Sequence, residues 1–143
     1  MNWQDWLTLS PEAFGSRLRH RLDRTCEFDD IVDLHNELIA TCDHNARHVA
    51  EVARVIASLM QQRDLHWERL LFLELTARAG YTAGDVRGAF KALETLARAD
   101  DTDDTRETVL EIVRVAVEDA DSVASSIDQR PAVFRAAARL LEY

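Results

Sequence analysis

Glycine, proline and cysteine are scarce in this 143-residue chain, with four, two and two of each. So few glycines and prolines argue against a turn-rich β-sandwich. The longest apolar run, Leu70 to Leu73, has four residues, far short of the ~20 that a membrane-spanning helix needs. The N-terminal stretch MNWQDWLTLS lacks the basic and apolar regions of a signal peptide. We therefore expect no membrane association, a cytoplasmic location, and reduced thiols rather than a Cys26–Cys42 disulfide.

The motifs of several enzyme classes are missing as well. The four glycines form neither a dinucleotide-binding GxGxxG motif nor a phosphate-binding P-loop, and the chain has no nucleophile elbow and no paired CxxC motif. Acidic residues occur in every predicted helix, so their presence marks no particular catalytic pair. We expect no cofactor, and a non-enzymatic role is favoured over an enzymatic one.

Helical spacing of apolar residues runs through almost the whole chain. Hydrophobic residues make up 47% of it, and its length is typical of one domain, so residues 1–143 are predicted to form a single all-α domain. A short turn around Trp3 to Leu7 precedes six or seven helices. The first is expected at 11–25, and the others pair into antiparallel hairpins at 29–62, 64–98 and 104–142.

The ends of the predicted helices follow from capping residues. Ser10 precedes Pro11 as an N-cap, and Asp64, Thr82 and Asp104 are placed at the same position of later helices. Gly80 is expected to end the helix that begins after Asp64. That helix opens with Trp67 and is apolar on nearly every side, which predicts that it is the most buried one, with Leu73 at its centre.

The hairpins are predicted to form a compact bundle, and a short stack of helical hairpins is the alternative. The segment GDVRGAFKAL at 84–93 resembles the second helix of a tetratricopeptide repeat. Ala77 and Gly80 stand where that repeat has a glycine and an aromatic residue in its first helix, so the resemblance covers about 15 residues of one hairpin and assigns no family. It implies the alternative arrangement, a stack like that of tetratricopeptide or HEAT repeats.

The net charge of −9 is concentrated in one segment. Residues 100–121 have a net charge of −7, and the predicted core positions 109, 112, 113, 116 and 117 leave acidic residues on the opposite side of that helix. An acidic chain argues against nonspecific nucleic-acid binding. We predict binding of another protein with a basic surface, as in an immunity-type inhibitor, an adaptor or a small subunit of a complex. The predicted contact residues are Asp101, Asp104, Glu107 and Glu111.

Other features leave alternatives open. Trp3 and Trp6 either pack onto the helices as a lid or anchor an interface. A homo-oligomer is also left open. A basic stripe, Arg17–Arg24, makes a nucleic-acid-associated subunit a further alternative.

A histidine and cysteine cluster at 35–51 supports a different alternative, a small metal-dependent enzyme or sensor. His44 and His48 are four residues apart, and Glu51 could supply a third ligand to a divalent ion. The glutamate of an HExxH motif is absent, and no second ligand pair matches the two histidines. His35 lies on an apolar helix face and is predicted to be a buried, hydrogen-bonded side chain.

Overall fold

The computed structural model describes residues 3–24, 27–120 and 135. These residues form a short 3-10 helix, η1 (Trp3–Trp6), and five α-helices and contain no strand, which confirms the all-α class. The α-helices are α1 (Pro11–Leu22), α2 (Phe28–Gln62), α3 (His66–Thr82), α4 (Val86–Ala99) and α5 (Asp103–Ala120). The helix expected near the C-terminus, in the second half of the 104–142 hairpin, lies outside the described residues.

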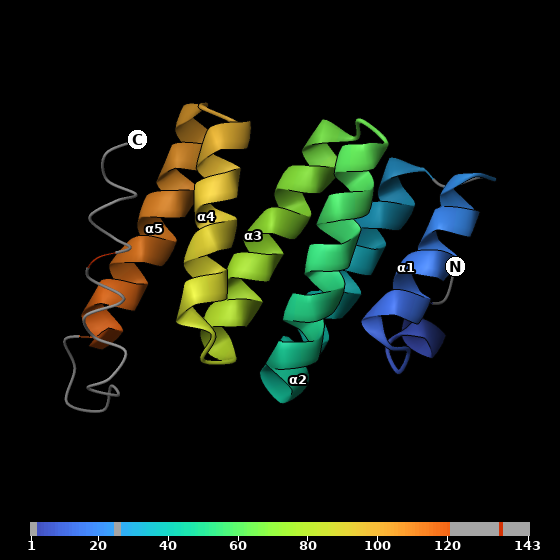
Figure 1. Cartoon of the computed structure of the whole chain (residues 1–143), viewed down its shortest axis with the longest axis horizontal. Helices are drawn as coiled ribbons and strands as arrows, with labels where there is room; N and C mark the ends of the chain where they lie inside the picture. Colours follow the sequence, from blue (N-terminus) through green and yellow to red (C-terminus); the bar gives the residue numbers. More distant parts are fainter. Residues whose placement is uncertain (1–2, 25–26, 121–134, 136–143) are drawn as a thin grey trace.

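The predicted count of six to seven helices is too high for the described part of the chain, chiefly because of α2. The hairpin expected at 29–62 is a single element that bends sharply at Asn45, whose φ of −151° and ψ of 54° are not helical. The chain reverses direction at this bend, so the two halves of α2 lie antiparallel (Figure 1). One residue leaves the helical conformation, and no separate loop forms.

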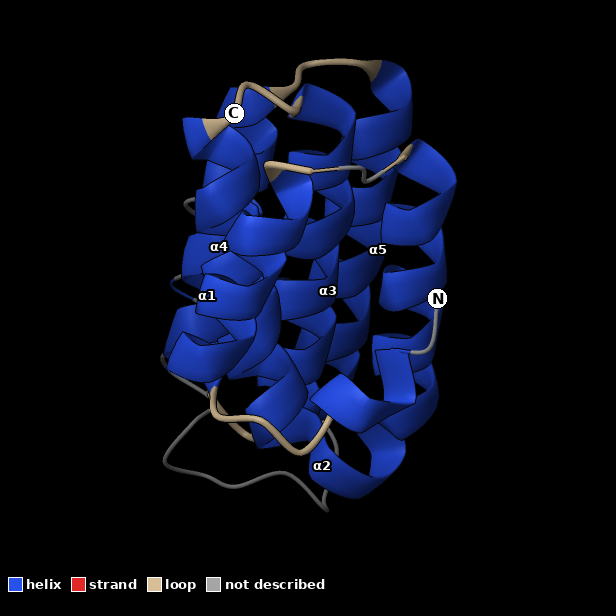
Figure 2. Cartoon of the chain, turned by 90° about the vertical axis from the view of Figure 1, so that its right-hand side faces the viewer, coloured by secondary structure: helices blue, strands red, loops and turns tan. Residues whose placement is uncertain are grey.

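The helices stand in a row, with α1 at one end and α5 at the other (Figure 1). Viewed from the α1 end, their axes run side by side along one direction (Figure 2). Most contacts join consecutive helices, from α1 with α2 through α4 with α5, and α3 also touches α5. Each described helix therefore packs mainly against the helices that precede and follow it in the chain.

Helix α3 occupies the middle of the row and packs against α2 and α4. Phe72 is completely buried, and its ring meets the His35 ring of α2 edge-on, with the ring centroids 5.6 Å apart. Leu73, expected at the centre, keeps 8% of its surface exposed. The helix is apolar on two sides because two neighbours cover it, and Phe72 marks its centre.

The connection between α2 and α3 corrects one predicted cap. Asp64 has a positive φ of 57°, and its N–H donates to the Gln61 carbonyl at 3.2 Å. The N–H of Leu65 donates to the Met60 carbonyl at 2.9 Å. This pair of hydrogen bonds is a Schellman motif. Asp64 therefore ends α2 and does not cap α3.

The same motif ends α3, four residues later than predicted. Gly84 has a φ of +86°, and its N–H donates to the Tyr81 carbonyl at 3.0 Å, while the Asp85 N–H reaches the Gly80 carbonyl at 2.9 Å. Gly80 lies inside the helix, against Ala89 of α4. The Asp85 side chain, in place of that of Thr82, then caps α4.

Of the other two predicted caps, Ser10 is confirmed and Asp104 is wrong. Ser10 caps α1 as predicted, since its hydroxyl accepts a hydrogen bond from the Ala13 N–H at 3.2 Å. At α5 the hydroxyl of Thr102 accepts from the Thr105 N–H at 3.4 Å. Asp104, the predicted cap, lies inside the first turn of that helix.

Within the described residues, no helix is long and apolar enough to cross a membrane.

We expect Phe72→Ala to destabilise the fold by about 3–5 kcal/mol and Leu73→Ala by about 2 kcal/mol, because truncating the fully enclosed ring leaves the larger cavity. Urea unfolding of both variants tests the order. Leu110→Ala is the control, since Leu110 is 44% exposed and should change stability by less than about 0.5 kcal/mol. A larger loss for Leu73→Ala would place the centre of the core elsewhere.

The two glycines of the α3–α4 connection should respond with opposite signs. A Cβ on Gly84 meets no atom within 4 Å, so Gly84→Ala should cost about 1 kcal/mol purely through its left-handed backbone. A Cβ on Gly80 would lie at an ordinary 3.6 Å from Ala89, so Gly80→Ala should be neutral or stabilise by up to about 1 kcal/mol. Thermal unfolding measures both, and the reverse order would restore Gly80 as the end of α3.

Candidate functional site

A groove opens along one side of α3, between the start of α2 and the first turns of α5. We call it the acidic groove, because its walls contain three carboxylates and no cationic side chain. The groove is lined by Phe28, Trp67, Leu70, Leu71, Glu74, Leu96, Asp100, Thr102, Asp104, Thr105 and Thr108.

Two aromatic side chains stand at this groove with much of their surface uncovered. Trp67 is 63% exposed and Phe28 is 50% exposed. The Trp67 ring meets the His66 ring at a centroid distance of 5.2 Å. Large apolar side chains that are exposed next to polar groups are typical of protein interaction sites, where tryptophan is enriched among the residues that matter most.

Asp100 supplies a fixed negative charge at the edge of the groove. Its carboxylate accepts hydrogen bonds from the hydroxyl groups of Thr102, at 2.7 Å, and Thr105, at 2.5 Å. The bond from Thr105, followed by that from Thr102, holds the pKa of Asp100 below its ordinary value. The same two threonines lie in the connection to α5 and its first turn, so the turn that starts this helix also keeps the carboxylate ionised and oriented.

The four predicted acidic contact residues, Asp101, Asp104, Glu107 and Glu111, are all exposed. Only Asp104 lines the acidic groove. Glu111 lies 4.0 Å from the guanidinium of Arg78, which also pairs with Glu74 at 3.0 Å. The predicted core side of α5 is buried at positions 109, 112, 113 and 116 and half-buried at 117, which explains why the acids face outward.

The exposed tryptophan is not one of the two that the sequence suggested as interface anchors. Trp3 is 2% exposed, and its indole N–H donates to the Asp30 carbonyl at 3.1 Å. Trp6 packs edge-on against both Trp3 and Phe14. This is the lid arrangement, and an anchoring role for Trp3 would require the segment to detach. Trp67, which sequence reasoning placed in a buried helix, is the exposed indole. Helix α3 is apolar on two sides, so the spacing of its apolar residues does not identify its open face.

The predicted metal ligands are not brought into one site. Asn45 interrupts the helix between His44 and His48, so the four-residue spacing no longer places both rings on one helical face. His44 is exposed, while His48 and Glu51 are half-buried. Across the described ranges, no group of three or more histidine, cysteine or acidic side chains could hold a metal ion.

His35 and Cys42 are half-buried on α2. Burial lowers the pKa of His35, and the nearby charge of Glu74 offsets part of this effect. Burial, followed by the charge of Asp43, raises the pKa of the free Cys42 thiol, which favours its unreactive protonated form. The other cysteine, Cys26, lies outside the described residues.

The predicted basic stripe forms a surface on α1. Arg17, His20, Arg21 and Arg24 line a shallow hollow beside Trp6. Arg17 and Arg24 are exposed, whereas the Nε atom of Arg21 is buried and has no hydrogen-bond acceptor among the described residues. The stripe faces a different part of the surface from the acidic groove and shares no residue with it.

The chain matches no protein-family model, no curated protein and no solved structure.

We expect His35 to make the stability of the protein depend on pH. Its folded-state pKa lies below the ordinary value of 6.5, so its contribution to stability is complete above pH 6.5 and is lost as the pH falls below that value. Unfolding by urea at several pH values from 7.5 to 5.5 should show a decline that is smaller in His35→Gln. The exposed His44→Gln is the control and should keep the wild-type slope; an unchanged slope in His35→Gln would contradict the assignment.

Proposed function

We propose that this chain is a non-enzymatic protein-interaction domain that binds a basic segment of another protein in the acidic groove. The observation that supports this most directly is the exposure of Trp67 and Phe28 beside Glu74, Asp100 and Asp104, with no cation in the lining. An apolar contact surface bordered by charge of one sign favours a segment that combines apolar and positively charged side chains.

The chemistry of the groove suggests how such a segment is held. The Trp67 ring can accept an arginine or lysine against its face, which is worth about 0.5–1 kcal/mol at an exposed site. Leu70 and Leu71 offer apolar contact at the base, and Asp100 and Asp104 can pair with a second cation. The acidic charge around α5 would steer a basic partner toward this site and raise the association rate.

This function fits an immunity-type inhibitor, an adaptor or a small subunit of a larger complex, acting in the cytoplasm without a cofactor. The basic stripe on α1 supports a second candidate, a nucleic-acid-associated subunit, because its three arginines and one histidine gather beside an indole. The metal-dependent enzyme or sensor at 35–51 ranks last, since the bend at Asn45 separates its ligand pair.

The acidic groove can be tested with an amphipathic helical peptide of arginine and leucine as the probe. We expect it to bind with a blue shift of tryptophan emission, because Trp67 is the most exposed indole among the described tryptophans. Asp104→Lys should slow association and flatten its dependence on ionic strength, and Trp67→Phe should remove most of the emission change. Stopped-flow fluorescence at several salt concentrations measures both.

Glu107→Lys is the matched control for that experiment. It makes the same change of charge at an exposed position of α5 that does not line the acidic groove. Equal effects of Glu107→Lys and Asp104→Lys would mean that the probe senses only the overall charge. A peptide with glutamate in place of arginine should not bind, and binding of that peptide would contradict the proposal.

A further inference from the structure

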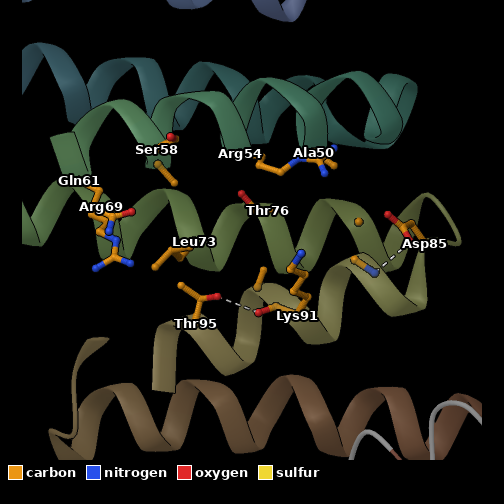
Figure 3. A pocket seen from close by; sticks show the side chains of 14 residues that line it. Ala50, Arg54, Ser58, Gln61, Arg69, Leu73, Thr76, Asp85, Lys91 and Thr95 are labelled. Carbon is orange, nitrogen blue, oxygen red and sulfur yellow. Dashed lines mark hydrogen bonds between the residues drawn. The ribbon is translucent and has the colours of Figure 1, made fainter. Parts of the chain in front are cut away.

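A second groove follows the other side of α3, between the second half of α2 and α4 (Figure 3). We call it the basic groove, because three cationic side chains line it. Its lining residues are Ala50, Arg54, Ala57, Ser58, Gln61, Arg69, Leu73, Thr76, Gly80, Asp85, Gly88, Lys91, Ala92 and Thr95.

The two grooves use nearly opposite faces of α3. The basic groove takes the α3 positions 69, 73, 76 and 80, and the acidic groove takes 67, 70, 71 and 74. At 3.6 residues per turn, the centres of these two sets lie about 140° apart around the helix axis. A ligand in one groove therefore leaves the other accessible.

The cations of the basic groove have no ionic partner. Arg54, Arg69 and Lys91 form no ion pair within the described residues, whereas Arg63, Arg78 and Arg114 do. Arg54 lies along the α2 wall with its guanidinium near Ala50, and Lys91 points from α4 toward α3 on the opposite side (Figure 3). Unpaired cations that converge on an otherwise acidic protein favour an anionic ligand between them.

The lining of the basic groove contains one acidic residue, which caps α4. Asp85 lies at one end of the groove, and its carboxylate accepts the N–H of Gly88 at 3.0 Å as the cap of α4. The hydroxyl of Thr76 donates to the Phe72 carbonyl at 2.6 Å. The lining has three cationic side chains and one carboxylate, so its net charge is positive.

Small side chains line the basic groove along its length and leave room for a ligand. Alanine or glycine occupies five of the lining positions, namely Ala50, Ala57, Gly80, Gly88 and Ala92. From Arg69 to Gly80 the floor follows α3 for eleven residues, which is about 16 Å at 1.5 Å per residue. An extended peptide of about five residues has this length. The shape therefore suits an extended segment of polyproline II conformation better than a compact small molecule.

We propose that the basic groove binds an extended acidic segment of a partner protein. One carboxylate of the segment lies between Arg54 and Lys91, and a second reaches Arg69. Thr76 is seven residues from Arg69 along α3, or about 10 Å. This matches two acidic residues three positions apart in a segment of polyproline II conformation, where such residues lie about 9 Å apart on the same side of the chain. This site is independent of the acidic groove and would let the domain hold two partner segments of opposite charge at once.

The test uses calorimetric titration of the full chain with two synthetic octapeptides, acetylated and amidated at their ends. One has glutamate at two positions three residues apart in an alanine–serine background, and the other has glutamine at both. Each surface ion pair contributes up to about 1 kcal/mol, so we expect the glutamate peptide to bind about tenfold more tightly. The double variant Arg54→Glu with Lys91→Glu should remove this preference.

The double variant Arg87→Glu with Arg106→Glu is the matched control, because both residues are exposed and neither lines the groove. It should keep the preference for the glutamate peptide, and circular dichroism should show all variants folded. Equal binding of the two peptides, or an unchanged preference in the double variant, would overturn the proposal. Concentration-dependent self-association that the double variant abolishes would also overturn it, since a second copy of the chain would then be the occupant.

Discussion

The packing of α3 between α2 and α4 is the constraint on which the rest of the structure depends. Phe72 is enclosed completely, with the His35 ring of α2 against it, and the sharp bend at Asn45 places both halves of α2 in the row of helices. A helix with neighbours on two sides must be apolar on both, which explains why α3 shows no single hydrophobic face. The directions left open between these neighbours become the two grooves.

Those grooves differ in charge because different elements complete them. The start of α5 and the end of α4 add Asp100 and Asp104 beside Trp67 on one side. The second half of α2 and the middle of α4 add Arg54 and Lys91 on the other. In this arrangement α3 separates two oppositely charged surfaces, and the net charge of −9 conceals a local excess of positive charge. Overall charge alone would have assigned this chain to basic partners only.

Sequence reasoning succeeded where local periodicity decides the outcome. Four of the five predicted core positions of α5 are buried and Val117 is half-buried, because an amphipathic helix with one covered face reveals that face in its spacing. The predicted N-caps Asp64, Thr82 and Asp104 were wrong. Asp64 and Gly84 are both left-handed residues that end helices, and a chemical pattern such as Gly84-Asp85 fits the end of one helix as well as the start of the next.

The amino-acid sequence by itself determined that the chain is helical, which faces of its amphipathic helices are buried, and where the acidic charge lies along the chain. These properties depend on residues within a few turns of one another. Only the tertiary structure decided that Trp67 is exposed, that Asn45 separates His44 from His48, and that Arg54 and Lys91 share a groove. The physical reason is that the open side of a doubly covered helix, and the partners of a charge on its neighbours, depend on how distant segments pack.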